Sequence, residues 1–129
     1  MLVAMPGNGL LGSRLASVLD ADIAEIEHRR FPDGETYLRF LSAPEGRDLA
    51  ILCTLDRPDD KVPALLFAAQ TARELGARSV GLLCPYLAYM RQDRRFKPGE
   101  AITSKQFASV LSAHFDWLVT VDPHLHRRS

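Results

Sequence analysis

The chain alternates between short, continuous apolar runs and longer segments whose apolar residues recur every three or four positions. Runs of the first kind predict buried parallel strands, and spacing of the second kind predicts helices that pack on a sheet. We therefore expect strands at 2–5, 48–54, 79–84 and 117–121, and helices at 10–19, 62–75 and 103–115. This alternation predicts an α/β domain with a mostly parallel sheet and helices on both faces.

The segment 23–40 has a different pattern, because its apolar and polar residues alternate one by one. Pro32, Asp33 and Gly34 form a turn at its middle, which predicts a protruding antiparallel hairpin. A hairpin inserted in a parallel sheet has no sequential strand to cover it, so we expect a second subunit to cover its apolar side chains. These side chains belong to Ile26, Tyr37, Leu38 and Phe40.

Turn residues mark the ends of the predicted helix 62–75. Asp59 or Asp60 is the expected N-cap, because a short carboxylate can accept hydrogen bonds from the first backbone N–H groups. Gly76 is expected to end the helix, because glycine readily adopts the left-handed conformation found after helix C-termini.

The length of 129 residues suits one domain, and its 47% hydrophobic and 25% charged residues are typical of a globular protein. No apolar run approaches the roughly 18 residues that a membrane span needs, and the start lacks a signal-peptide pattern, so a cytoplasmic location is expected. Cys53 and Cys84 are then expected to be buried thiols rather than redox or metal-binding groups. A formal net charge of zero argues against a general nucleic-acid binder.

A glycine motif follows the first predicted strand, where Gly7, Gly9 and Gly12 match G-x-G-x-x-G. Glu27 stands about 20 residues further on, near the place where a dinucleotide-binding site has its acidic ribose ligand. Such a site also needs a parallel second strand that leads into another helix, whereas here the chain turns back in a hairpin. The context therefore favours a tight strand-to-helix turn.

A dense cationic loop follows the strand 79–84, at the carboxyl edge of the predicted sheet, where open α/β sheets bind ligands. Arginine side chains match phosphate oxygens in pairs, so the loop suggests a phosphorylated small molecule. A solvated charged loop is the alternative. The cationic residues are Arg91, Arg94, Arg95 and Lys97, with Gln92 and Asp93 among them.

Two further segments carry candidate chemistry. At the hairpin tip, Phe31 could stack on a purine while Asp33 and Glu35 accept hydrogen bonds from its amino group, although an ordinary polar turn has the same composition. After the last predicted strand, Asp122 and His124 could hold a metal ion or its waters.

Together these segments resemble the N-terminal half of ribose-phosphate diphosphokinase, also called phosphoribosyl pyrophosphate synthetase. The matching pieces are FPDGE at 31–35, PYLAYMRQDRRFKPGEAITSK at 85–105 and VDPH at 121–124, in the family's order. The resemblance implies a phosphoribosyltransferase-like fold in residues 1–129. It also implies a transferase of nucleotide biosynthesis that moves diphosphate from ATP to ribose 5-phosphate, with Mg²⁺ as cofactor.

The resemblance also assigns roles to residues of this chain. It implies that Phe31, Asp33 and Glu35 hold adenine, that Arg91 and Gln92 also bind ATP, and that His124 assists the Mg²⁺. It further implies a homo-oligomer whose ATP sites are shared between subunits. The full set expected to bind ATP is Phe31, Asp33, Gly34, Glu35, Arg91 and Gln92.

The chain departs from the family pattern in several places. Phe96 stands where many members have an acidic residue, which puts one adenine or allosteric contact in doubt, and DPH replaces the commoner DLH at His124. The D-D-x-x-x-T-G-G-T loop for ribose 5-phosphate does not occur in the sequence, so catalytic residues are expected in a C-terminal domain absent here, and the chain alone is expected to be inactive.

Two functions from other classes stay open. The chain could be a non-catalytic regulatory subunit that binds a full-length synthetase, in which case it would form a complex with that enzyme. It could also be a nucleic-acid-binding module that uses residues 90–97, in which case binding would be sensitive to salt. The balanced charge makes the second function the weaker alternative.

Overall fold

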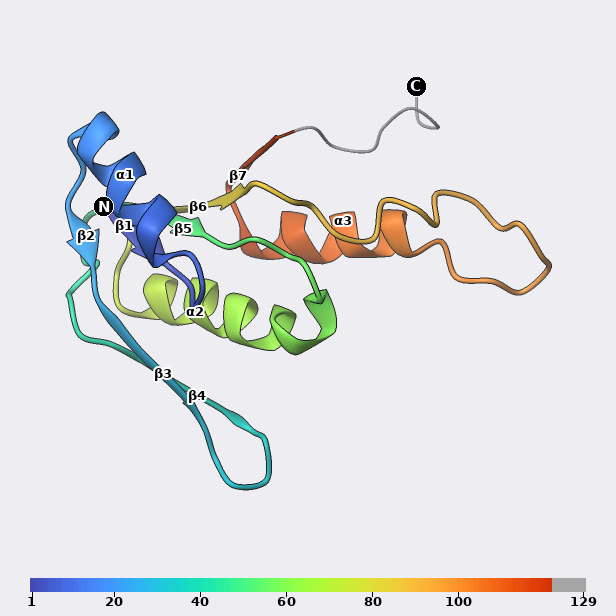
Figure 1. Ribbon diagram of the computed structural model, residues 1–129, viewed down its shortest axis with the longest axis horizontal. Helices are drawn as coiled ribbons and strands as arrows, with labels where there is room; N and C mark the ends of the chain where they lie inside the picture. The colour runs from blue at the N-terminus through green and yellow to red at the C-terminus, as the bar shows by residue number, and fades with distance from the viewer. Residues whose placement is uncertain (122–129) are drawn as a thin grey trace.

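The computed structural model describes residues 1–121, whose main sheet has five strands in the order β2-β1-β5-β6-β7 (Figure 1). All neighbouring strands in this sheet are parallel, as the alternation of strands and helices predicts. The five strands are β1 (Leu2–Ala4), β2 (Ile23–Ala24), β5 (Asp48–Leu52), β6 (Ser79–Cys84) and β7 (Trp117–Thr120). The helices are α1 (Gly9–Leu19), α2 (Val62–Glu74) and α3 (Thr103–His114).

The helices lie on both faces of the sheet, with α1 on one side and α2 and α3 on the other (Figure 1). Side chains along β5 point alternately to the two faces of the sheet, which explains this layering. Leu49 and Ile51 belong to the core shared with α2 and α3, whereas Leu52 packs in a smaller core with Ala16 of α1. Both faces of the central strands are therefore apolar, as a buried parallel sheet requires.

The glycine motif forms the predicted tight turn from β1 into α1. A Cβ atom on Gly12 would lie 2.8 Å from the Cβ of Ala4, so glycine permits the close packing of helix on strand. Asn8 is buried, and its amide nitrogen donates to the Met5 carbonyl at 3.2 Å. Its Oδ1 accepts hydrogen bonds from the backbone N–H and the hydroxyl of Thr54 at 3.2 and 2.8 Å. These contacts tie the turn to the end of β5.

The predicted hairpin begins later than its sequence pattern indicates. Ile23–Ala24 forms β2 and pairs in parallel with β1, because Ala24 is a buried residue of the main core. The antiparallel hairpin consists of β3 (Ile26–Arg30) and β4 (Thr36–Phe40), and it protrudes from the body of the protein (Figure 1).

The expectation that a second subunit must cover the apolar residues of the hairpin is wrong for three of the four. Ile26, Leu38 and Phe40 are partly buried against the main core of the same chain, and β4 packs on α2. Tyr37 alone lies on the part of the hairpin that is not packed on this core, where its ring contacts Arg29 and Phe31. The hairpin therefore has its own support at its base.

The predicted N-cap of α2 is also wrong. Asp59 and Asp60 lie in a short 3-10 helix, η1 (Pro58–Asp60), and Lys61 occupies the N-cap position. Pro58 favours this extra turn because its fixed φ suits the first turn of a helix. The C-terminal prediction is confirmed, since α2 ends at Glu74 and Gly76 has a φ of 95°. Within residues 1–121, none of the helices is long and apolar enough to span a membrane.

Candidate functional site

The cationic loop occupies residues 85–102, between the end of β6 and the start of α3, and extends well beyond the sheet (Figure 1). Its first residues continue the interstrand contacts of β6, because the Leu55 N–H donates to the Tyr86 carbonyl at 3.1 Å. The loop therefore leaves from the carboxyl edge of the parallel sheet. This edge is where ligands bind in open α/β folds.

Arg91 and Gln92 lie where this loop meets the first turn of α3. The backbone N–H of Ser104 donates to the Gln92 carbonyl at 3.1 Å, which satisfies one of the N–H groups that a helix start leaves without a partner. The Gln92 side chain donates to the Arg94 carbonyl at 2.7 Å, and the Arg91 side chain is exposed. The backbone just after Arg91 is thus attached to the start of α3, and Arg91 itself is exposed.

Phe96 has a definite contact in this loop. The guanidinium carbon of Arg94 lies 4.7 Å from the centre of the Phe96 ring, a distance suited to a cation–π interaction. Phe96 is one of the positions at which the sequence is expected to depart from the pattern of the family that it resembles. An acidic residue here would attract a neighbouring arginine through its carboxylate, whereas Phe96 attracts Arg94 through the face of its ring.

Sequence reasoning missed Asp93, which looks like one more solvated charge in a cationic run. Both of its carboxylate oxygens are buried, and neither has a hydrogen-bond partner among the described residues. A buried carboxylate without a partner is costly, so a donor or a cation is expected to complete this part of the loop. Only the path of the loop in three dimensions reveals this residue, since Arg91 and Arg94 close to it in sequence are exposed.

The hairpin tip is held by its own hydrogen bonds. The Phe31 N–H donates to the Glu35 carbonyl at 2.8 Å, and the Gly34 N–H donates to the Phe31 carbonyl at 2.8 Å. Asp33 Oδ1 accepts the backbone N–H of Glu35 at 3.0 Å, and Gly34 has a φ of 93°, which favours glycine. One Asp33 oxygen therefore stabilises the turn.

Phe31 belongs to a group of aromatic and cationic side chains in contact on the hairpin. Its ring meets Tyr37 edge to face, with centroids 5.9 Å apart. The guanidinium carbon of Arg29 lies 4.1 Å from the Tyr37 centroid and 5.3 Å from that of Phe31. Phe31 is still 41% exposed. A ring that is held by neighbours and yet accessible is suited to stack on a flat ligand.

Gly34 and Glu35 also line a cleft of about 470 Å³ between the hairpin and the start of α2. Arg30 spans this cleft, because its Nη2 donates to the Asp60 carbonyl at 2.8 Å. Phe67 of α2, which is 52% exposed, forms part of the opposite wall. The hairpin is thereby steadied by its own chain close to the tip.

The structure does not bring the two groups of predicted ATP-binding residues together within one chain. The hairpin tip carries Phe31, Asp33, Gly34 and Glu35, and the cationic loop carries Arg91 and Gln92. Figure 1 shows these segments leaving the body in different directions, the tip at the lower edge and the loop at the right. The predicted metal residue His124 lies outside the described residues.

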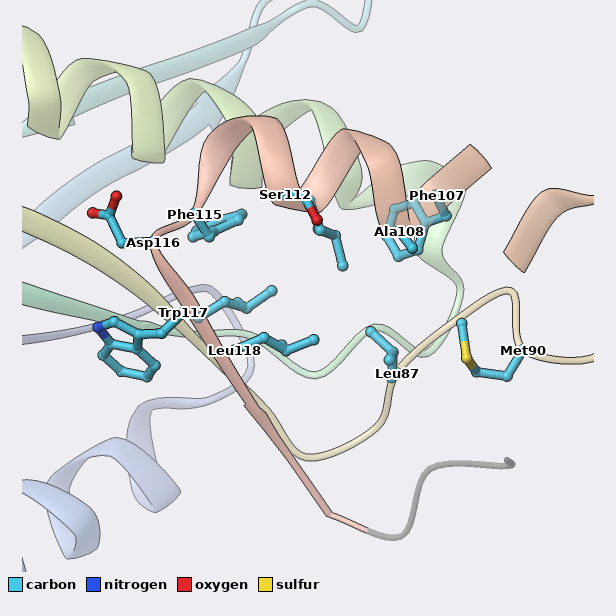
Figure 2. A pocket seen from close by; sticks show the side chains of 11 residues that line it. Leu87, Met90, Phe107, Ala108, Ser112, Phe115, Asp116, Trp117 and Leu118 are labelled. Carbon is cyan, nitrogen blue, oxygen red and sulfur yellow. The ribbon is translucent and has the colours of Figure 1, made fainter. Parts of the chain in front are cut away.

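An apolar cavity of about 340 Å³ lies elsewhere, between α3 and the end of the sheet (Figure 2). Leu87 and Met90 line it from the loop, Phe107 from α3, and Trp117 and Leu118 from β7. None of the residues predicted to bind ATP lines it. Its apolar walls suit packing better than the recognition of a phosphate.

The two cysteines lie beneath the carboxyl edge, at the ends of adjacent strands. Cys53 and Cys84 are 2% and 1% exposed, which confirms the prediction of buried thiols. Burial raises the pKa of Cys53 to about 11 and that of Cys84 to about 12. Both side chains therefore remain protonated at neutral pH and act as small apolar groups.

Comparison with known proteins places this fold in a family. Residues 1–114 match the family model described as the N-terminal domain of ribose phosphate pyrophosphokinase. The ribose-phosphate pyrophosphokinase of Methanopyrus kandleri is 40% identical over 125 residues, which cover 96% of this chain and 43% of that protein. The enzyme of the same name from Saccharolobus solfataricus is 42% identical over 112 residues, or 85% of this chain and 38% of that one.

A solved structure gives the same result. The crystal structure of phosphoribosylpyrophosphate synthetase from Mycobacterium smegmatis superposes with a TM-score of 0.87 at 26% sequence identity, over 95% of this chain and 42% of that one. The chain therefore spans less than half the length of each of these relatives. Its matched region, fold and sequence show that it belongs to the ribose phosphate pyrophosphokinase family, whose N-terminal domain it matches over residues 1–114.

Proposed function

We propose that this chain is the ATP-binding half of an enzyme that transfers diphosphate from ATP to ribose 5-phosphate, and that each ATP site is shared between two subunits. The single observation that carries the proposal is the separation of the hairpin tip from the cationic loop (Figure 1). An aromatic ring suited to adenine and a guanidinium suited to phosphate face different surroundings in one chain. A second copy can bring its loop to this chain's tip.

The side chains suit the two ends of ATP. The exposed Phe31 ring, held by Tyr37 and Arg29, offers a face for adenine. Arg91 of the other copy would face the phosphates, where a guanidinium can donate two parallel hydrogen bonds. Because the ATP polyphosphate carries several negative charges, the positive charge of the loop also favours its approach.

The proposed reaction moves one diphosphoryl group. The 1-hydroxyl oxygen of ribose 5-phosphate attacks the β-phosphorus of ATP and loses its proton, and the bond from the β-phosphorus to the oxygen of the α-phosphate breaks. AMP leaves, and phosphoribosyl diphosphate forms. Such a transfer depends mainly on holding nucleophile and leaving group in line and on neutralising phosphate charge. In this chain Arg91 and Gln92 would serve the ATP side.

Mg²⁺ is the expected metal, because it binds oxygen ligands and neutralises phosphate charge. Within residues 1–121 no three His, Cys, Asp or Glu side chains gather as a metal site. Mg²⁺ often uses only one or two carboxylates and keeps several waters, so the proposed ion would arrive with the nucleotide. The buried Asp93 carboxylate is an oxygen donor of the right kind in the described part of the loop.

Mixing two defective chains tests the shared site. Phe31→Ala removes the adenine contact and Arg91→Ala the phosphate contact, so neither variant alone should bind ATP well. In a mixed dimer one of the two sites contains neither substitution. We expect isothermal titration calorimetry with Mg²⁺ present to show ATP binding restored in the mixture, up to a quarter of all sites when subunits pair at random.

Two controls make this experiment decisive. Circular dichroism must show that both variants fold, and mass spectrometry of the native complex must show that subunits exchange. If both hold and the mixture binds ATP no better than either variant alone, the shared-site proposal is wrong. Mixing Phe31→Ala with Glu35→Ala serves as the matched comparison, because both substitutions lie at the hairpin tip, so every shared site contains one of them and no binding should be restored.

A further inference from the structure

Tyr89 has a backbone conformation that a bulky residue rarely adopts. Its φ is 65°, in the left-handed region, where the Cβ atom comes close to the backbone. Such a conformation persists only when the surroundings hold it, and it is often found where a side chain must be aimed. Tyr89 stands two residues before Arg91 in the chain.

The surroundings that hold Tyr89 belong to α3. The Tyr89 ring lies against the Phe107 ring, with centroids 4.9 Å apart and a tilt of 58°. Tyr89 and Phe107 line a groove between α2 and α3. Met90 and Phe107 instead line the apolar cavity near β7 (Figure 2). The side chains of Tyr89 and Met90 therefore pass on different sides of Phe107.

A second attachment lies just after Arg91, where the Gln92 carbonyl accepts the Ser104 N–H at 3.1 Å. Arg91 therefore stands between two attachments to the same helix, one made by rings and one by the backbone. Met90, which lies between Tyr89 and Arg91, is 8% exposed, and Tyr89 is half-buried, while Arg91 is exposed. Rotation of the Arg91 backbone would require at least one attachment to break.

We propose that Tyr89 is a positioning residue, whose ring anchors a left-handed turn on Phe107 and thereby fixes the direction in which Arg91 points. We call the two attachments of this segment to α3, Tyr89 to Phe107 and Gln92 to Ser104, the clamp. The effect of the clamp on phosphate binding rests on the proposed function, but the clamp itself does not depend on it. An arginine fixed in advance loses less conformational freedom when it binds an anion, so binding is tighter. The tyrosine hydroxyl has no part in this role.

Limited digestion with trypsin measures the clamp without any nucleotide. Trypsin cleaves after arginine, and cleavage of a folded chain needs local opening of the backbone. We expect Tyr89→Ala to speed cleavage after Arg91 about tenfold relative to cleavage after Arg95, because the anchoring ring is lost. Tyr89→Phe keeps the ring and should leave the rate unchanged. Tyr86→Ala removes an exposed tyrosine from the same segment and is the matched control.

A second variant covers the case in which Tyr89→Ala fails to fold. Phe107→Leu removes the partner ring but keeps most of its volume, and it should produce the same selective cleavage after Arg91. Unchanged cleavage after Arg91 in the folded variants would overturn the clamp. Equal acceleration in Tyr89→Ala and Tyr86→Ala would overturn it as well, because the effect would then belong to the whole loop.

Calorimetry with ATP and Mg²⁺ adds the functional consequence. Tyr89→Ala should raise the Kd for ATP about tenfold, whereas Tyr89→Phe should leave it within about twofold. If trypsin shows the clamp but the unsubstituted chain does not bind ATP, the proposed function fails and the positioning of Arg91 stands. If ATP binds Tyr89→Ala as tightly as the unsubstituted chain, Tyr89 does not position Arg91 for the nucleotide.

Discussion

Arg91 and Arg95 belong to the same exposed loop, yet they have different places in it. The backbone next to Arg91 is attached to α3 through Gln92, and Arg91 is the residue that we propose contacts the phosphates of ATP. We expect Arg91→Ala to weaken ATP binding more than Arg95→Ala, by about 1.5 to 3 kcal/mol, which is typical of a hydrogen bond to a charged group. Calorimetry of both variants at two salt concentrations measures the difference.

The salt series distinguishes a specific contact from a general charge effect. A loop that merely attracts anions would lose similar affinity from either substitution, and both losses would shrink as salt screens the charges. Such a result would contradict the role assigned to Arg91. A loss confined largely to Arg91→Ala, and retained in higher salt, would support it.

The buried cysteines predict how stability depends on alkaline pH. Because folding raises their pKa values above the usual 9.0, to about 11 and 12, the unfolded chain loses these protons first as pH rises. The free energy of unfolding should therefore be unaffected by these thiols below about pH 8.5 and should fall between about pH 9 and about pH 12.

Urea denaturation at a series of pH values measures this fall. In a Cys53→Ala, Cys84→Ala double variant, the part of the pH dependence due to thiols should disappear. An equally steep fall in the double variant would show that other groups cause it. A reducing agent is needed in all samples, because free thiols exposed by unfolding can oxidise.

At the scale of single residues, the sequence reveals chemical type but not environment. The burial of Cys53 and Cys84 was predictable because both lie in apolar strand patterns. The buried carboxylate of Asp93 and the left-handed Tyr89 were not, because both depend on how a long loop folds back on α3. No local pattern in a loop of this kind specifies its path.

The pairing of β6 with β7 depends on one glycine. Gly81 lies opposite Trp117, and a Cβ atom at Gly81 would lie only 1.8 Å from the Trp117 ring. We expect Gly81→Ala to displace the ring and to lower the free energy of unfolding by about 1 to 3 kcal/mol, as overpacking does elsewhere. Trp117 is the only tryptophan, so its fluorescence reports both the displacement and the unfolding.

Gly9→Ala is a suitable control for this substitution. A Cβ atom at Gly9 would have no described neighbour within 4 Å, and the residue begins α1. Alanine should therefore be neutral or slightly stabilising there, and the tryptophan spectrum should not change. If Gly81→Ala leaves both the spectrum and the stability unchanged, the close contact between the ring and β6 does not matter in solution.

At the scale of elements, regular patterns were enough for most of the fold. The strands and helices of the main sheet follow from continuous apolar runs and helical spacing, and the hairpin follows from its alternation. The start of the hairpin and the cap of α2 were missed for physical reasons. Ile23–Ala24 is drawn into the sheet by pairing with β1, and Pro58 adds a short helix that takes up both candidate aspartates.

At the scale of the whole molecule, the hairpin and the loop were both identifiable as candidate sites, but their relation was not. Sequence alone gives no distance between a tip at residues 31–35 and a loop at residues 91–97. Their placement in different directions is a tertiary property, set by the packing of β4 on α2 and of the loop base on α3 (Figure 1). Because the tip and the loop lie apart in one chain, we propose that the two groups of residues meet between two subunits.

The length of the chain relative to its family leads to the last prediction. The chain covers 43% of the Methanopyrus kandleri enzyme, and its sequence has no D-D-x-x-x-T-G-G-T loop for a sugar phosphate. If Arg91 and Phe31 serve only the ATP side, they do not hold the attacking hydroxyl in line, on which most of the rate depends. We expect the chain to form no phosphoribosyl diphosphate above background from ATP, Mg²⁺ and ribose 5-phosphate.

Chromatographic detection of AMP and phosphoribosyl diphosphate, formed in equal amounts, is the measurement. The preparation must have the intact mass of the chain, so that a longer host enzyme cannot supply the activity, and the Arg91→Ala variant is purified alongside as a check for such contamination. Turnover that is present in the unsubstituted chain and lost in Arg91→Ala would contradict the prediction, because the 129 residues would then hold both substrates. Equal turnover in both preparations would instead identify a contaminant, since the substitution removes a residue on which the proposed ATP site depends.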